Sequence, residues 1–393
     1  MKQAILTINA GSSSIKFALF PLAKPISPEA EFSGQIDGIG TSATKMVAKD
    51  RSGARIADQA IPGEQVSHDQ AFDALLKWFQ ATQTGWQIIA VGHRVVHGGD
   101  RYSQPTVIDA TVLAHLTSFI PLAPLHEPHN VAGIRALQAL MPDVPQVACF
   151  DTAFHRSQPD VAQVFGLPRA LTAEGIKRYG FHGLSYEFIA RALPEHSHRA
   201  NGRVVVAHLG NGASMAAMVN RKCVATTLGF STIDGLLMGT RCGNLDPGVV
   251  LHLMETKGYS VKDMTRILYK ESGLLGVSGI SQDMRTLLAS EAPEAREAVE
   301  LFCYRIVREL GSLIAAAGGI DALVFTGGIG EHAAEVRRRV CLQLGWLGLQ
   351  LDAEANARHA KVISAGQSQV DVLVIPTNEE WMMAHHAQTL LAL

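Results

Sequence analysis

Short apolar runs rich in β-branched residues alternate with segments of helical periodicity along the whole chain. The runs lie at 5–8, 88–91, 204–207, 322–325 and 370–375 and are typical of buried strands. Helical patterns occupy 70–80, 293–317 and 331–344, and Gly345 is expected to end the last of these helices as a C-cap. This alternation predicts the α/β class.

Two of these strands open similar stretches half a chain apart. ILTINAGSSSIKFAL and VVVAHLGNGASMAAM align with Gly11 on Gly210 and Asn9 on His208, a separation of 199 positions (210 minus 11). Each is expected to form a strand, a turn of small residues and a second strand. This similarity favours two similar domains that arose from a duplicated unit. The length of 393 residues agrees with two domains, because single hydrophobic cores stop growing at about 250 to 300 residues.

Charge and cysteine content indicate which binding partners and which cellular compartment to expect. Lys and Arg total 34 against 36 Asp and Glu, so the chain lacks the basic field that drives nucleic-acid binding, and no nucleic-acid partner is expected. The five cysteines are scattered and form no CxxC pair, which favours reduced thiols and a cytoplasmic location. No signal peptide and no membrane span are expected, because Asn9 and the Gly-Ser run interrupt the first apolar stretch.

Three strands are expected to run into turns of small residues, at 9–14, 208–212 and 326–331. Backbone N–H groups in such turns can approach a phosphate closely, although a tight hairpin is the simpler explanation for any one of them. Together they favour a nucleotide. The P-loop pattern is missing, because Lys16 follows isoleucine within a strand; residues 328–333 do match G-x-G-x-x-A, with Asp352 at the right distance, so a dinucleotide site stays open.

Charged residues gather near the ends of the predicted strands. Arg94 and Arg241 lie among glycines, where a guanidinium can form a two-pronged bond to a carboxylate or phosphate. Asp151 and His182 follow apolar segments, and each of the four could equally be a structural polar group. Glu379 offers a hard oxygen ligand for magnesium, or belongs to an exposed acidic turn.

Two closely spaced histidine pairs are candidates for zinc ligands. His93 and His97 lie in a strand-like segment without the glutamate of a helical HExxH motif. For His126 and His129, the flanking prolines at 124 and 128 argue against a helix. A catalytic zinc is therefore not expected.

Ten segments, in order from residue 3 to the C-terminus, resemble the acetate kinase family: TINAGSSSIKF, VGHRVVHGG, FDTAFH, RYGFHGLSY, VAHLGNGAS, LGFSTIDGLLMGTR, GLLGVSGIS, DMR, FTGGIGEH and PTNEE. The resemblance implies two duplicated ribonuclease H-like α/β domains, as in actin, Hsp70 and sugar kinases, with an ATP cleft between them and usually a homodimer. It places the acyl-substrate and magnesium side in 1–150 plus 376–393 and the nucleotide side in 151–375. The implied reaction is reversible phosphorylation of acetate by ATP, giving acetyl phosphate and ADP, with Mg²⁺ or in its place Mn²⁺.

The same resemblance assigns roles residue by residue. Asn9 and Glu379 would hold the metal ion. Arg94 would bind the acyl carboxylate against an apolar wall of Val96, Leu125 and Phe181. Catalytic roles fall to Asp151, His182 and Arg241. The ATP-binding set would be Lys16, His208, Leu209, Gly210, Asn211, Gly212, Asp283, Met284, Arg285, Gly327, Gly328, Ile329, Gly330 and Glu331.

The chemistry suits these roles. In-line phosphoryl transfer requires positioning and neutralisation of charge on the equatorial oxygens, which two arginines, a histidine and magnesium supply. A carboxylate acceptor titrates near about pH 4, so it is already ionised and needs no general base. We therefore hypothesise that Asp151 orients a magnesium-bound water or Arg241.

Several positions depart from the family pattern: Thr232 replaces proline in the acyl pocket, Ala225 an aspartate, Glu127 an asparagine, Cys242 a serine and Asn244 an aspartate. Because one methylene is worth only about 1 to 3 kcal/mol in an apolar pocket, the change at Thr232 makes propionate a rival of acetate.

Three other functions are alternatives to this one. A sugar kinase would need a base beside a hydroxyl-binding pocket, where this chain has an apolar wall. An actin-like or Hsp70-like ATP switch would hydrolyse ATP without an acceptor or form filaments. A non-catalytic paralogue is disfavoured by the retained Arg94, Asp151, His182 and Arg241.

Overall fold

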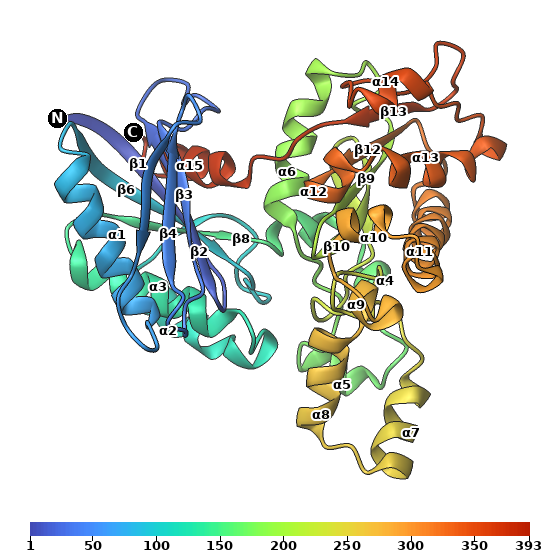
Figure 1. The fold of residues 1–393 in the computed structure, drawn as a ribbon, viewed down its shortest axis with the longest axis horizontal. Coiled ribbons are helices and arrows are strands. Elements are labelled where there is room, and N and C mark those ends of the chain that lie inside the picture. The colour runs from blue at the N-terminus through green and yellow to red at the C-terminus, as the bar shows by residue number, and fades with distance from the viewer. The chain divides into compact units, whose positions relative to one another are not determined.

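The computed structural model describes residues 1–393, which form two compact units (Figure 1). The first comprises Met1–Ala153 and Asn378–Leu393, and the second Phe154–Thr377. Asp151 was expected to open the second domain but lies in the first unit, because its N–H still donates to the carbonyl of Val95 at 3.0 Å as the chain leaves the sheet.

The first unit is built on an eight-stranded sheet in the order β5-β4-β3-β2-β1-β6-β8-β7. β1 pairs antiparallel with β2 and parallel with β6, and β6 pairs parallel with β8. The strands are β1 (Lys2–Ala10), β2 (Ser14–Pro21), β3 (Phe32–Asp37), β4 (Lys45–Asp50), β5 (Arg55–Ala60), β6 (Trp86–Val95), β7 (Thr106–Val107) and β8 (Gln146–Phe150).

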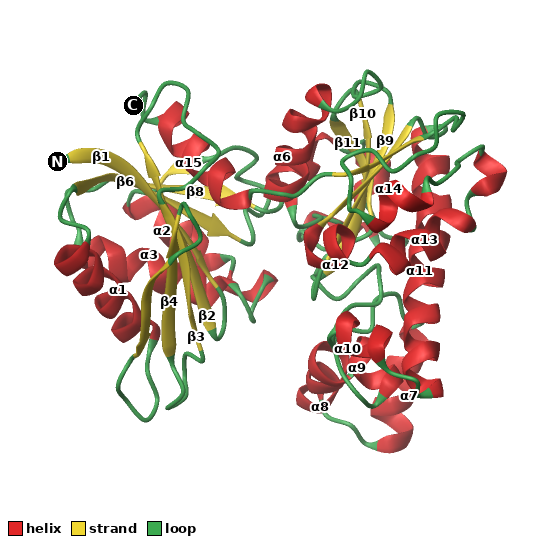
Figure 2. Cartoon of the chain, turned by 45° about the horizontal axis from the view of Figure 1, so that its top comes forward, coloured by secondary structure: helices red, strands yellow, loops and turns green.

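Helices cover both faces of this sheet (Figure 2). They are α1 (His68–Thr82), α2 (Ala110–Ser118), α3 (Glu127–Leu140) and the C-terminal α15 (Glu379–Leu390). Phe72 and Trp78 of α1 and Leu137 of α3 pack with Phe17 in the core on one face. On the other, α15 approaches β6 so closely that a Cβ on Gly92 would lie 2.9 Å from the carbonyl oxygen of Met383. Glycine at position 92 thus permits the C-terminal helix α15 to pack closely against β6.

The second unit has a five-stranded sheet in the order β11-β10-β9-β12-β13. Its strands are β9 (Arg203–Leu209), β10 (Ala213–Val219), β11 (Lys222–Thr226), β12 (Ala322–Thr326) and β13 (Asp371–Val374). Its helices are α4 (Asp160–Gln163), α5 (Arg169–Ala173), α6 (Gly183–Ala192), α7 (Pro247–Lys257), α8 (Val261–Arg266), α9 (Gly273–Ser278), α10 (Met284–Ala289), α11 (Pro293–Ala317), α12 (Gly327–His332), α13 (Ala334–Leu342) and α14 (Ala353–Ala357). Tyr186 and Ile189 of α6 pack on the sheet core, and α11 contacts β9, β10 and β11.

The two sheets share one topology. The run β3-β2-β1-β6-β8 in the first unit corresponds to β11-β10-β9-β12-β13 in the second. In both runs the first two pairings are antiparallel and the last two parallel. The predicted α/β class and the duplicated unit are confirmed.

Two sequence-based predictions about helices were wrong. The helix expected over 331–344 is divided into α12 and α13 at Ala333, and Gly345 begins a 3-10 turn instead of capping α13. At the division Ala333 leaves helical geometry, with φ −98° and ψ 80°, and Arg337 Nη1 donates to the carbonyl oxygens of Gly330 and Glu331 at 2.8 Å, which a continuous helix would use for its own N–H groups.

Residues 127–140 do form a helix, although prolines were expected to prevent one near His129. Pro128 lies in the first turn of α3, where a backbone N–H has no intrahelical acceptor and its loss costs nothing.

None of the helices is long and apolar enough to cross a membrane.

Candidate active site

Three polar side chains meet at the carboxyl ends of β1, β6 and β8. Parallel neighbouring strands end at the same sheet edge, which brings together Asn9, Arg94 and, directly after β8, Asp151. Arg94 Nε lies 3.0 and 3.1 Å from the two carboxylate oxygens of Asp151, and its Nη2 completes the ion pair. Nη1 donates to Asn9 Oδ1 at 3.1 Å. Arg94 is thus held from two sides by groups on neighbouring strands.

Burial strengthens this arrangement. The Asp151 side chain is 0% exposed and that of Arg94 20% exposed. Burial alone would lower the pKa of Arg94, but the charges of Asp151 and Glu379 raise it above its ordinary value. The guanidinium stays charged, with one part of its surface open to a ligand.

Glu379 opens α15 at the same edge. Its Oε2 lies 4.0 Å from Arg94 Nε, and burial raises the pKa of its carboxyl to about 7 against the opposing effect of Arg94. Its side chain is 16% exposed, so an exposed acidic turn is the wrong description. The helix start is fixed by Asn378, whose Oδ1 accepts the N–H of Trp381 at 2.9 Å.

Asn9 and Glu379 suit a hard divalent cation. Both approach Arg94, so an amide oxygen and a desolvated carboxylate lie around one place. The structure has no group of three or more His, Cys, Asp and Glu able to hold a metal. Mg²⁺ commonly takes only one or two protein oxygens and completes its shell with water and phosphate, so this sparse donor set fits it.

Val96 directly follows β6, two residues after Arg94, whereas the place of Leu125 in the acyl wall stays a prediction. Val96 is 2% exposed, and its N–H donates to Asn130 Oδ1 at 2.9 Å, while Asn130 Nδ2 donates to Ala10 O. Asn130 therefore ties the ends of β1 and β6 to α3, a structural role that nothing in its sequence context indicated.

Phe181 belongs to the second unit and is 1% exposed there, so its place in an acyl pocket stays a prediction.

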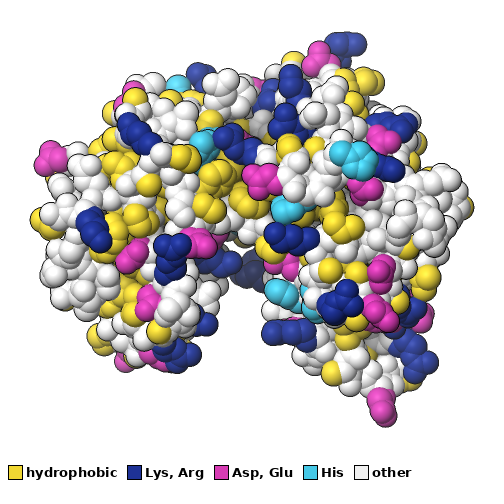
Figure 3. All heavy atoms as spheres, turned by 90° about the horizontal axis from the view of Figure 1, so that it is seen from above, with side chains coloured by type: hydrophobic (Ala, Val, Ile, Leu, Met, Phe, Trp, Pro, Cys, Tyr) yellow, Lys and Arg dark blue, Asp and Glu magenta, His cyan; other side chains and the backbone are white.

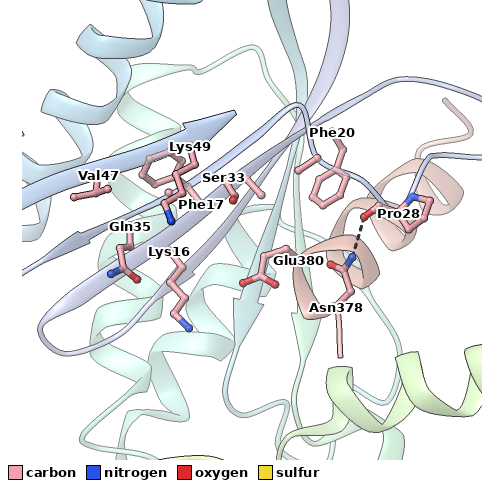
Figure 4. A pocket seen from close by; sticks show the side chains of 13 residues that line it. Lys16, Phe17, Phe20, Pro28, Ser33, Gln35, Val47, Lys49, Asn378 and Glu380 are labelled. Carbon is pink, nitrogen blue, oxygen red and sulfur yellow. Dashed lines mark hydrogen bonds between the residues drawn. The ribbon is translucent and has the colours of Figure 1, made fainter. Parts of the chain in front are cut away.

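Lys16 lies on β2 directly opposite Asn9 in the antiparallel register, on the same face of the sheet. It lines a cavity of 520 Å³ in the first unit, with Gln35, Lys49 and Glu380 around it (Figure 4). Lys16 is thus next to the Arg94 cluster. Its predicted contact with ATP stays a prediction.

The second unit gathers its own polar cluster at the corresponding sheet edge. His182, in the left-handed conformation before α6, places its Nδ1 2.8 Å from Ser214 Oγ. Its ring stacks on that of His208 at 4.4 Å between centroids. A Cβ on Gly212 would lie 3.4 Å from His182 Nε2 and 3.7 Å from Arg241 Nη1. The turn after β9 therefore lies close to both catalytic candidates, His182 and Arg241.

A cavity of 410 Å³ lies beside this turn and unites three of the predicted nucleotide segments. Its lining includes Gly210, Asn211, Asp283, Met284, Arg285, Gly328 and Ile329. Four further lining residues lie outside the predicted ATP-binding set: Gln282, Leu288, His332 and Ala333, of which the last two belong to the G-x-G-x-x-A match at 328–333. Gln282 and His332 directly adjoin predicted segments, Ala333 follows His332, and Leu288 lies on the next turn of α10.

The remaining predicted nucleotide residues shape the turns. Gly327 has φ +75°, and a Cβ there would lie 2.8 Å from the carbonyl oxygen of Leu209, so this position needs glycine. Glu331 accepts the N–H of Gly327 and, at 3.4 Å, that of Thr377. Leu209, Gly327 and Gly330 are buried. These buried residues fix the backbone of the turns beside the 410 Å³ cavity.

The departures from the family pattern have distinct surroundings. The carbonyl of Thr232 accepts from Arg241 Nη1 at 3.0 Å, so this residue helps to hold the arginine. Asn244 Nδ2 donates to Glu309 Oε1 at 3.0 Å. Ala225 and Asn244 line a separate 200 Å³ cavity of the second unit.

Comparison with known proteins identifies the family of this chain. The sequence matches the Acetokinase family profile over residues 4–385. It is 54% identical to an acetate kinase of Rhodopseudomonas palustris over 98% of both chains, and 50% identical to one of Methylocella silvestris over 100% of this chain and 98% of that one. Among solved structures, a propionate kinase from Francisella tularensis superposes with a TM-score of 0.91 at 37% identity, covering 98% of this chain and 99% of that one. The acetate kinase of Porphyromonas gingivalis gives 0.89 at 35% identity, covering 99% and 100%. The chain therefore belongs to the acetokinase family.

Proposed function

We propose that the protein catalyses reversible, magnesium-dependent transfer of the γ-phosphoryl group of ATP to acetate, giving acetyl phosphate and ADP. The observation that carries the proposal is Arg94: a charged, partly open guanidinium held by Asp151 and Asn9 beside the apolar Val96. A short-chain carboxylate matches this combination of charge and apolar surface.

On the acceptor side, Arg94 would bind and orient the acetate carboxylate. Asp151 engages the Nε edge and Nη2 of the guanidinium, which fixes the direction of the remaining donor surface. Val96 and Leu125 would exclude water around the methyl group. Because the acceptor is already an anion at neutral pH, no residue needs to remove a proton from it. The contact of Asp151 with Arg94 gives it a positioning role, whereas its predicted link to Arg241 or a metal-bound water stays untested.

On the donor side, the 410 Å³ cavity would hold the nucleotide, with the turn after β9 near the phosphates. His182 and Arg241, both close to Gly212, would stabilise charge on the transferring phosphoryl group. Asn9 and Glu379 would hold Mg²⁺, which neutralises phosphate charge when bound; Mn²⁺ is the alternative ion.

The preferred acyl chain is testable by a hydroxamate assay of acyl phosphate with ATP and Mg²⁺, comparing acetate, propionate and butyrate. We expect kcat/KM to fall about tenfold or more from acetate to propionate, because an added methylene must fit against Val96 and Leu125. A higher value for propionate would contradict acetate as the substrate. ATP binding and hydrolysis without any acyl phosphate would favour an ATP switch.

We also propose a cytoplasmic homodimer. The second unit carries exposed apolar side chains over one stretch, Leu245, Val249, Leu251, Tyr259 and Val261, each 40% to 69% exposed. Such a surface suits a subunit interface. Figure 3 shows positive and negative side chains interspersed over the face it displays. Light scattering should give twice 42.2 kDa; a monomer mass at micromolar concentration would contradict the dimer.

A further inference from the structure

Two buried hydroxyl groups are linked to the Nδ1 atom of His182. Ser214 on β10 places its Oγ 2.8 Å from His182 Nδ1, and the hydroxyl of Tyr186 on α6 lies 2.5 Å from the same Oγ. Ser214 and Tyr186 are both 0% exposed. The mechanism above uses neither of these hydroxyl groups, although they form a continuous chain with a catalytic candidate.

The other ring nitrogen of His182 faces the glycine turn after β9. A Cβ on Gly212 would lie 3.4 Å from His182 Nε2. This turn is the segment proposed above to lie near the phosphates of ATP. Nδ1 is therefore the nitrogen bonded to the protein interior, and Nε2 is the nitrogen that would meet a phosphoryl oxygen.

A second set of contacts holds the His182 ring in this orientation. His182 has φ 59° and ψ 27°, a left-handed conformation that a residue with a side chain adopts only when its surroundings hold it there. Its ring stacks on that of His208, with 4.4 Å between the ring centres. His208 on β9 is in turn bonded to α6, because its Nδ1 lies 2.8 Å from Ser185 Oγ. Each histidine thus ties the start of α6 to the hairpin of β9 and β10.

The direction of the hydrogen bonds decides which nitrogen of His182 carries a proton. A serine hydroxyl has one hydrogen, so Ser214 donates either to His182 Nδ1 or to Tyr186. A phenol is a more acidic donor than an aliphatic alcohol, so the favoured direction is from Tyr186 to Ser214 and from Ser214 to Nδ1. A neutral imidazole that accepts at Nδ1 carries its hydrogen on Nε2.

The surroundings of Nε2 also suit a neutral ring with a hydrogen on this atom. Arg241 Nη1 would lie 3.7 Å from the same Cβ position of Gly212, and a nearby positive charge disfavours protonation of an imidazole. Phosphoryl oxygens are hydrogen-bond acceptors. An Nε2–H group attracts them, whereas the lone pair of a bare Nε2 repels them.

We infer that Ser214 and Tyr186 are positioning residues, which set the neutral tautomer of His182 and direct its Nε2–H at the transferring phosphoryl group. Tyr186 orients the Ser214 hydroxyl, and Ser214 donates to Nδ1. His182 then stabilises the charge of the phosphoryl group as a donor that is already in place. The kinetic consequence rests on the proposed function, whereas the tautomer is a property of the protein alone.

The kinetic test compares wild type with Ser214→Ala and Tyr186→Phe. Ser214→Ala removes the donor to Nδ1, so the proton of His182 can occupy either nitrogen. We expect kcat to fall about tenfold to a hundredfold, because a ring in the wrong tautomer presents a lone pair to the phosphoryl oxygens. The KM values for ATP and acetate should stay within about threefold of wild type. Tyr186→Phe retains the Ser214 hydroxyl, so its kcat should fall less, by about threefold to tenfold.

Ser197→Ala is the matched control in the same unit. Ser197 is also buried, at 7% exposure, and its Oγ donates to Asp371 Oδ2 at 2.6 Å at the start of β13. Thermal unfolding should show similar losses of stability for Ser197→Ala and Ser214→Ala, but the kcat of Ser197→Ala should equal that of wild type. Equal kcat values for the two alanine variants would overturn the positioning role. A loss confined to KM in Ser214→Ala would also overturn it.

The tautomer itself can be read without any substrate from long-range ¹H–¹⁵N correlation spectra of the histidine rings, recorded at the pH of the assay. The signals of His182 are assigned by their absence in His182→Asn. We expect a proton on Nε2 and none on Nδ1 in wild type, and a mixture of the two tautomers in Ser214→Ala. A proton on Nδ1 in wild type would overturn the inference. If wild type forms no acetyl phosphate, the proposed function fails, while these spectra still decide the tautomer of His182.

Discussion

Replacing Asp151 with asparagine is expected to reduce kcat/KM for acetate by about two to four orders of magnitude. The change keeps the shape of the side chain but leaves Arg94 without the carboxylate that holds its Nε and Nη2. Removing one partner of a buried pair costs about 3 to 5 kcal/mol. Steady-state kinetics with ATP and Mg²⁺ measures the loss, and calorimetric titration with ATP should show nucleotide binding unchanged, because the 410 Å³ cavity lies in the other unit.

The matched control is Asp58→Asn, which breaks the surface pairs of Asp58 with Lys45 and Arg55 in the same unit. Surface pairs contribute little, so its kinetics should equal those of wild type. A kcat/KM for Asp151→Asn within tenfold of wild type would contradict the role of Asp151 in holding Arg94. Loss of a basic limb in the pH-rate profile, with magnesium dependence unchanged, would instead indicate proton transfer by Asp151.

Gly273→Ala should disable the second unit through its backbone. Gly273 has φ +67°, and a Cβ there would lie 2.2 Å from the carbonyl oxygen of Met238 and 2.9 Å from the backbone nitrogen of Arg241. Backbone atoms cannot move aside as a flexible side chain can, so the loop that carries Arg241 must shift. We expect a loss of about 3 kcal/mol or more in unfolding free energy and at least a hundredfold lower kcat.

Gly258→Ala separates this clash from conformational strain. Gly258 has nearly the same φ, +71°, but no atom lies within 4 Å of the position of its Cβ. Its alanine variant should lose only about 1 kcal/mol and keep its activity. Similar melting temperatures and rates for the two alanine variants would show that the contact of Gly273 with the Arg241 loop has no consequence.

The strands and their duplication were readable from sequence because buried parallel strands require continuous apolar runs, as at 204–207 and 322–325. The break at Ala333 could not be predicted, because the carbonyl groups of Gly330 and Glu331 are bonded by the side chain of Arg337, a contact that no helical pattern indicates. Arg94 and Asp151 were each visible as charged residues at strand ends. The two residues are 57 positions apart in the sequence and meet because β6 and β8 are neighbouring strands. No local sequence pattern indicates which strands are neighbours.

Glu127 is another residue whose surroundings could not be predicted from the sequence. In the sequence it is an acidic residue between a histidine and a proline, and such a residue is ordinarily exposed. Its burial arises only when the start of α3 packs against the segment after β6. The four additional lining residues of the 410 Å³ cavity are likewise assembled by the approach of α10 and α12 to the turn after β9.

The most direct test of the account is the initial rate of acetyl phosphate formation from acetate, ATP and Mg²⁺, trapped as the hydroxamate and compared with ADP release. The account predicts one acetyl phosphate per ADP in wild type, and no acetyl phosphate above background in Arg94→Leu, which retains ATP binding. ADP release without acetyl phosphate in wild type, or an unchanged rate in Arg94→Leu, would contradict it.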